Sequence, residues 1–136
     1  MISLVPSEEV YRIWPDVAPL LQMAIDVTPS RYDLEGLFEE LDAGRTQLWI
    51  GFDEDYKVHS AGITRIYETQ LAKIISIEWL GGERLDEWEE EAIKITESYG
   101  KQNGCSIHEV RGRDGWGRRL AKYGWTKVNS TFERLI

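Results

Sequence analysis

The amino-acid sequence predicts a mixed α/β fold of the α+β class, with a mostly antiparallel central sheet flanked by helices. Apolar residues recur at helical spacing up to Gly44 and then alternate from Leu48 onward. A β-branched run over residues 73–80 leads through two glycines into a new helical stripe. With 136 residues, 42% of them hydrophobic and 29% charged, the chain is expected to fold as a single domain, residues 1–136.

The N-terminal part is expected to contain a short strand followed by a helix. Residues 2–5 are the strand, and Ser7-Glu8-Glu9 offers a cap and an acidic first turn for the helix. Trp14-Pro15-Asp16 should break or restart that helix, because proline is accepted mainly at a first helical position. The helical stripe continues to Ile25, and Thr28-Pro29-Ser30 should form a loop.

A second helix and two strands are expected next. Asp33 suits the N-cap of the helix, and Gly44 is a natural stop after it. Residues 48–52 and 57–67 alternate as strands that are joined at Asp53-Glu54-Asp55. Because no further oxygen ligands are arranged around this acidic trio, a plain turn is preferred to a metal site.

The stretch from Lys73 to Trp88 organises the rest of the chain. It is expected to be a buried strand, a sharp turn at Gly81-Gly82 and the start of a helix that ends near Tyr99-Gly100. A strand that passes through glycines into a helix N-terminus is a common place to bind an anion. Trp88 lies on the apolar stripe of this helix and should be buried.

The C-terminal part is expected to add a strand, a short helix and a last β segment. Residues 106–111 are the strand, and a glycine-rich turn over residues 112–117 follows it. The short helix covers residues 118–123 and is stopped by Gly124. Residues 125–135 can then supply a final strand or hairpin.

This order of elements, together with Tyr123-Gly124-Trp125 near the end, resembles the GNAT acyltransferases along nearly the whole chain. In that family the fourth strand and the helix after it hold acetyl-CoA. The residues that the resemblance assigns to cofactor binding are Trp79, Leu80, Gly81, Gly82, Glu83, Arg84 and Leu85. The stretch from Gly104 to Trp116, together with Tyr123-Gly124-Trp125, more closely resembles small GNAT-like proteins of tailed phages, some of which are virion components.

The presumed pyrophosphate turn departs from the family pattern. Its two glycines lack the usual spacing, and only Arg84 is basic there. Acidic residues crowd the following turns; they are Glu83, Asp86, Glu87, Glu89, Glu90 and Glu91. Because like charges beside a pyrophosphate repel it, we expect weak or absent binding of CoA. An exposed acidic helix start is the plainer interpretation.

Two residues are candidates for catalysis. The resemblance implies a general base on the central strand, where Glu78 is the only acid; a Glu paired with a nearby Arg is the alternative. Many family members have a Tyr that protonates the leaving thiolate, but Leu120 stands at that position. Tyr123, beside Gly124, is the remaining candidate, although it also suits the core.

Other reactive residues give no strong signal. Cys105 is interpreted as a structural thiol, and His59 and His108 are too few for a metal site or a catalytic triad, so no metal is expected. A basic cluster comprises Arg111, Arg113, Arg118 and Arg119. It suits a CoA phosphate, an acidic partner or the chain's own carboxylates, of which the last is preferred.

Composition narrows the function to two classes. The net charge of −8 argues against nucleic-acid binding, and no apolar run approaches the length of a membrane span. No secretory signal is visible, and the resemblance to phage proteins implies a location in the host cytoplasm or a virion. The preferred hypothesis is a GNAT-fold structural or interaction protein, with a phage structural protein as its partner. The alternative is an acetyl-CoA-dependent N-acyltransferase that acts on an amine through Glu78.

Overall fold

The computed structural model describes residues 1–27 and 31–136, so the loop predicted at Thr28-Pro29-Ser30 lies outside the described residues. Five strands form one sheet in the order β1-β2-β3-β4-β5. Neighbouring strands are antiparallel from β1 to β4, and only β5 is parallel to its neighbour. The predicted α+β fold with a mostly antiparallel sheet is therefore confirmed.

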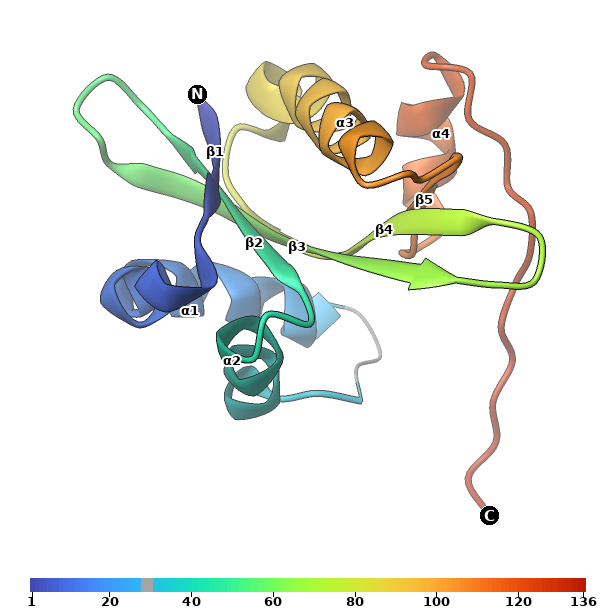
Figure 1. Ribbon diagram of the computed structural model, residues 1–136, viewed down its shortest axis with the longest axis horizontal. Coiled ribbons are helices and arrows are strands. Elements are labelled where there is room, and N and C mark those ends of the chain that lie inside the picture. The colour runs from blue at the N-terminus through green and yellow to red at the C-terminus, as the bar shows by residue number, and fades with distance from the viewer. Residues whose placement is uncertain (28–30) are drawn as a thin grey trace.

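Most elements have bounds close to the predicted ones, but the last helix begins at Gly115, inside the predicted glycine-rich turn, and ends at Ala121 instead of residue 123. The elements are β1 (Ile2–Val5), the 3-10 turn η1 (Ser7–Glu9), α1 (Val10–Val27), α2 (Leu34–Asp42), β2 (Gln47–Phe52), β3 (Val58–Glu68), β4 (Lys73–Gly82), α3 (Leu85–Gln102), β5 (Ile107–Val110) and α4 (Gly115–Ala121). Helices α1 and α2 cover one face of the sheet, and α3 and α4 lie on the other (Figure 1).

The larger core lies between the sheet and the α1–α2 layer. Its fully buried members are Val10, Val17, Leu21, Leu37, Leu41, Leu48, Ala61 and Ile63. The next residue of β2, Trp49, points to the opposite face, where its indole donates a 2.9 Å hydrogen bond to Thr64 and packs against Tyr99 of α3. The predicted alternation along β2 thus separates two layers of packing.

Helix α3 covers the second face of the sheet as predicted. Trp88 is buried on its stripe, and Gly100 lies against the side chain of Ile75 on β4. A Cβ atom at Gly100 would approach that Ile75 side chain to 2.7 Å, so glycine lets the helix sit close to the sheet. The helix continues two residues past Gly100 before it ends.

Helix α1 is continuous, so the break predicted at Trp14-Pro15-Asp16 is wrong. Pro15 and Pro19 both lie inside the helix, on its solvent side. Each removes one helical donor, but the carbonyl groups left without a donor are on the side that water can reach. Burial of Val17 and Leu21 on the other side stabilises the helix across both prolines.

The strand or hairpin predicted over residues 125–135 is also wrong, because this segment has no regular secondary structure. It extends away from the body along one side of the molecule (Figure 1). Two ion pairs hold it, from Lys127 to Asp114 and from Arg31 to Glu133. Alternating residues form a strand only where an edge pairs with them, and here the segment does not pair with β5.

Candidate functional site

The candidate site begins where β4 and β5 separate. The two strands pair only from Ile74 to Ile77 and from Ile107 to Val110. The amide of Arg111 still donates a 3.0 Å hydrogen bond to the carbonyl oxygen of Ile77. Beyond that point β4 continues to Gly82 with β3 as its only strand neighbour in the described sheet. Backbone groups of β4 on the β5 side therefore become available to a ligand.

A cleft of about 330 Å³ occupies this gap. Its walls are the end of α1, the last part of β4, the turn after β5 and the first turn of α4. Trp79, Leu80 and Leu85 supply apolar surface, and Arg113 and Trp116 lie on the opposite wall. The volume lies at the lower end of the range of about 300–1,000 Å³ for small-molecule pockets.

A β-bulge turns Glu78 toward the cleft. Ile63 and Thr64 are adjacent on β3, but their partners on β4 are Trp79 and Ile77, so Glu78 is the extra residue. As a result Glu78 and Trp79 both project from the face that α1 covers: Glu78 contacts Arg65, and Trp79 packs on the core below α1. The bulge brings a carboxylate to the wall of the cleft.

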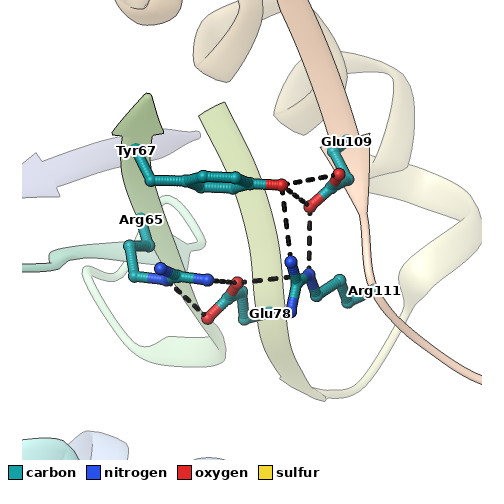
Figure 2. A network of polar contacts seen from close by, with 5 residues as sticks. All are labelled: Arg65, Tyr67, Glu78, Glu109 and Arg111. Carbon is teal, nitrogen blue, oxygen red and sulfur yellow. Dashed lines mark hydrogen bonds and ion pairs between the residues drawn. The ribbon is translucent and has the colours of Figure 1, made fainter. Parts of the chain in front are cut away.

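Glu78 belongs to a network of five side chains, four from strands β3, β4 and β5 and one, Arg111, from the residue just after β5 (Figure 2). Both of its carboxylate oxygens accept hydrogen bonds from Arg65, at 3.1 and 2.9 Å, and Oε2 lies 3.7 Å from Nε of Arg111. The hydroxyl of Tyr67 lies 2.8 and 2.9 Å from the two oxygens of Glu109, to which Arg111 also donates at 3.0 Å. Two guanidinium groups thus balance two carboxylates.

The network shifts the titration of three of its members, and the pKa of one of them, Arg65, is raised by its hydrogen bond to Glu78. Burial alone would raise the pKa of Glu109, but hydrogen bonds from Tyr67 and Arg111 hold that pKa below its usual value. Hydrogen bonds to Tyr67 and Glu109 raise the pKa of Arg111, which stays protonated. Glu78 is paired with Arg65, as the alternative interpretation of this residue predicted. Its role as a general base stays a prediction.

Three of the seven residues assigned to cofactor binding line the cleft: Trp79, Leu80 and Leu85. Gly81 and Gly82 belong to β4, so the predicted diglycine turn is wrong. A Cβ atom at Gly81 would overlap the carbonyl oxygen of Leu20, which shows that this glycine lets α1 approach the sheet. Gly82 has a φ of +131° and lies against the backbone of β3.

Glu83 and Arg84 form the turn instead. Arg84 has the left-handed φ of +58°, and the Glu83 carbonyl oxygen accepts a 2.7 Å hydrogen bond from the Trp88 indole. The guanidinium of Arg84 lies 3.8 Å from Asp53 and 3.7 Å from Glu87. The single basic residue of the presumed pyrophosphate turn is therefore already flanked by two carboxylates.

One ion pair beside the cleft was not predicted from the sequence. Glu89, predicted among the exposed acids, is buried and accepts hydrogen bonds at 3.1 and 3.2 Å from Arg119 of α4. Arg119 also contacts Asp86, so it fastens α4 to the first turns of α3. The burial of Glu89 could have been predicted from its position four residues after Leu85, next to the apolar stripe of α3.

The remaining arginines divide into two groups. Arg111 and Arg119 pair with the chain's own carboxylates, as the preferred interpretation predicted. Arg113 and Arg118 have no ion-pair partner among the residues that the structure describes. Only Arg113 of these two lines the cleft, so its positive charge is available to an anionic ligand there.

The structure does not bring Tyr123 to the described lining of the cleft. It lies just after α4, with the ammonium group of Lys122 5.2 Å from its ring centre. Leu120, at the position of the family's tyrosine, is buried. The proposed acid role of Tyr123 stays a prediction that this geometry does not favour.

The other candidates remain unremarkable. Burial raises the pKa of the Cys105 thiol, which suits a structural role. No cluster of potential metal ligands occurs within residues 1–27 and 31–136. In the same residues, no helix is both long and apolar enough to cross a membrane.

Comparisons with known proteins give a fold but no sequence relative. No family model matches the chain, and no curated protein matches its sequence. Among solved structures, ribosomal-protein-alanine N-acetyltransferase from Brucella melitensis is similar with a TM-score of 0.74 and 10% identity, over 100% of this chain and 99% of that one. The chain has the GNAT acetyltransferase fold.

Two further structures share this GNAT fold. Glucosamine-6-phosphate N-acetyltransferase from Arabidopsis thaliana has a TM-score of 0.71 and 17% identity, over 99% of this chain and 97% of its own. A GNAT family acetyltransferase from Staphylococcus aureus has a TM-score of 0.68 and 12% identity, over 100% and 98%. These likenesses give no support to the phage affiliation.

Proposed function

We propose that this GNAT-fold protein is an N-acyltransferase that moves the acetyl group of acetyl-CoA to an amine. The observation that carries the proposal is the cleft between the separated ends of β4 and β5, with the carboxylate of Glu78 on its wall. The similar proteins named above are acetyltransferases, which supports this choice over a purely structural role. The fold by itself does not define the reaction.

The cleft suits the acyl-bearing arm of acetyl-CoA. Trp79, Leu80 and Leu85 offer apolar contact, and the backbone of β4 past Ile77 offers hydrogen-bonding groups that no second strand uses. Acetyl-CoA, when bound, supplies an activated acyl group. A backbone N–H near Trp79 or Leu80 would polarise its thioester carbonyl.

The phosphate end of the cofactor has a weaker site. Arg84 is flanked by Asp53 and Glu87, whereas Arg113 on the opposite wall has no carboxylate partner in the described chain. Removal of the Arg84 charge should weaken binding of CoA. Removal of the Glu83 or Glu87 charge should strengthen it, more so at low salt, because exposed charges are then less screened.

Glu78 is proposed to accept the proton of the attacking amine through a water molecule. Arg65 binds both carboxylate oxygens of Glu78 and fixes their direction, so a bridging water fits better than direct contact with the amine. Because Leu120 cannot donate a proton and Tyr123 lies outside the described lining, solvent is proposed to protonate the thiolate.

A turnover assay tests the role of Glu78. Release of free thiol from acetyl-CoA is measured with a panel of small amines and peptide N-termini, for wild type, Glu78→Gln and Glu90→Gln. Glu90 is an exposed acid of α3 and serves as the matched control. We expect Glu78→Gln to lower kcat by about 10²–10⁴, with little change in acetyl-CoA affinity, and Glu90→Gln to have no effect. Equal turnover in all three proteins, or none with any amine, would contradict the proposal.

A second candidate function is a GNAT-fold binding protein without catalysis. It is favoured by Leu120 in place of a proton donor, by the pairing of Glu78 with Arg65 and by the acidic start of α3. A phage structural protein is the proposed partner in that case, in a virion or the host cytoplasm. Saturable acetyl-CoA binding with no turnover on any amine would favour this candidate.

A further inference from the structure

A second, smaller cavity lies between the sheet and α3, the helix that covers one face of the sheet (Figure 1). It has a volume of about 40 Å³ and an almost entirely apolar lining. The helix contributes Trp88, Ala92 and Thr96 to this lining, and β2, β3 and β4 contribute the rest of its regular structure. Because apolar cavities of this kind stay dry, an alkyl group that enters one displaces no ordered water.

Small residues of β3 create this space. Thr64 accepts a hydrogen bond from the indole of Trp49, which faces α3, so Ser60, Gly62 and Thr64 share that face of the strand. None of the three has a large apolar side chain to fill the gap below the helix. A Cβ atom at Gly62 would lie 3.0 Å from Cδ1 of Leu80 on the neighbouring strand. Leu80 therefore leans across Gly62 at the wall of the cavity.

The same wall belongs to the cleft. Ile77 and Leu80 of β4 line both the cleft and the cavity. They are successive residues on the α3 face, because the bulge turns Glu78 and Trp79 to the other face. Beyond Ile77 the strand β5 no longer pairs with β4. The Ile77 side chain is buried and that of Leu80 is half-buried, so Leu80 is the more easily displaced part of the shared wall.

We propose that this cavity receives the alkyl end of an acyl group longer than acetyl, so that the donor is an acyl-CoA whose acyl group has three or four carbons. The assignment rests on the proposed acyltransferase function, in which a backbone N–H near Trp79 or Leu80 polarises the thioester carbonyl. An acyl carbon held there lies beside Leu80, and the carbons after it push the Leu80 side chain aside. Because Glu78 projects from the opposite face of β4, the alkyl chain leaves the approach of the amine open.

The size of the cavity sets the length of the acyl chain. One water molecule needs about 10–15 Å³ of such a cavity, and a methylene group is somewhat larger than water. A volume of about 40 Å³ therefore has room for two carbons beyond acetyl. Each methylene group that leaves water improves an affinity about fourfold. Butyryl-CoA should thus bind about tenfold more tightly than acetyl-CoA, and hexanoyl-CoA should gain nothing further.

Calorimetric titration with acetyl-, butyryl- and hexanoyl-CoA tests the proposal. The measured quantity is the ratio of the acetyl-CoA to the butyryl-CoA dissociation constant. It should be about ten in wild type and fall to about one in Ala92→Leu, because the larger side chain fills the cavity from α3. Ala18→Leu is the matched control: it makes the same change in α1, at a half-buried position outside both described linings, and should keep the ratio of wild type.

Leu80→Ala tests the shared wall independently, and it decides the matter if Ala92→Leu does not fold in urea unfolding curves. Removal of the Leu80 side chain joins the two spaces, so hexanoyl-CoA should then bind at least about fourfold more tightly than butyryl-CoA.

Three results would overturn the proposal. Equal binding of acetyl-CoA and butyryl-CoA to wild type would do so and leave the acyltransferase function intact. A ratio of about ten that persists in Ala92→Leu would place the alkyl chain elsewhere. No saturable binding of any of the three compounds would contradict the proposed function itself, and this assignment with it.

Discussion

The buried pair between Glu89 of α3 and Arg119 of α4 gives the sharpest stability prediction. The Glu89 side chain is 6% exposed and that of Arg119 is 34% exposed. Two hydrogen bonds, at 3.1 and 3.2 Å, join them, and the Lys122 ammonium lies 3.6 Å from the same carboxylate. Glu89→Gln keeps the size of the side chain but removes the charge that these cations face.

The expected loss of stability in Glu89→Gln follows from how deeply the two side chains of the pair are buried. Removal of one partner from a fully buried ion pair costs about 3–5 kcal/mol, and exposed pairs contribute about 0–1 kcal/mol. Because water reaches part of Arg119 and Asp86 remains beside it, we expect Glu89→Gln to lower the free energy of unfolding by about 2–3 kcal/mol.

Urea unfolding followed by tryptophan fluorescence measures this change. With a slope of about 2 kcal/mol/M, the midpoint should fall by about 1 M or slightly more. The matched control is Glu90→Gln, the same substitution at the next residue, whose side chain is 65% exposed and pairs with Lys94 at 3.1 Å. It should cost less than about 0.5 kcal/mol. Equal losses for Glu89→Gln and Glu90→Gln would refute the reasoning from burial.

Three further predictions follow from packing and titration. Trp88→Ala should lower the free energy of unfolding by roughly 3–5 kcal/mol in the same urea assay, and an unchanged midpoint would place the indole in solvent. Gly81→Ala should destabilise by about 1–3 kcal/mol or more, because its Cβ atom meets the Leu20 carbonyl. Gly117→Ala, in α4 with open space around the new atom, should instead stabilise by about 0.5–1 kcal/mol; the opposite order would contradict the packing of α1 on β4. Burial lowers the pKa of His108 in the folded protein, so the unfolded chain binds more protons, and the free energy of unfolding should fall as the pH drops below about 6.5. In unfolding curves measured from pH 7 to 5, His108→Gln should make this fall smaller. An equal fall in wild type and His108→Gln would contradict the prediction.

The sequence predicted the fold well because most of its signals are local. The change of period after Gly44 and the cap at Asp33 need only neighbouring residues, and both are confirmed. Helix α1 was predicted poorly because Pro15 and Pro19 are strong local breakers. Burial of Val17 and Leu21 stabilises the helix by more than the two prolines destabilise it. This tertiary contribution cannot be predicted from a local sequence pattern.

The site was predicted in part. Trp79, Leu80 and Leu85 line the cleft, but the separation of β4 from β5 that opens it depends on how long two distant segments remain paired. The partner of Glu78 is Arg65 on the neighbouring strand, 13 residues earlier, so only the register identifies it. The strand predicted for the C-terminal segment was wrong for a related reason. An alternating pattern indicates an extended conformation, but it does not show whether the segment pairs with an edge strand of its own chain.

Calorimetric titration with acetyl-CoA is the most direct test that the cleft between β4 and β5 is the functional site. Gly115 lines the cleft and a Cβ atom there meets open space, so Gly115→Trp fills the cleft without a clash at the backbone. Gly117→Trp, which also meets open space but lies outside the described lining, is the control. The acidic start of α3 led to an expectation of weak or absent binding, but the cleft leads us to predict saturable binding to wild type and Gly117→Trp, and binding at least about tenfold weaker to Gly115→Trp. No saturable binding to wild type at about 1 mM, or equal binding to all three proteins, would contradict the account.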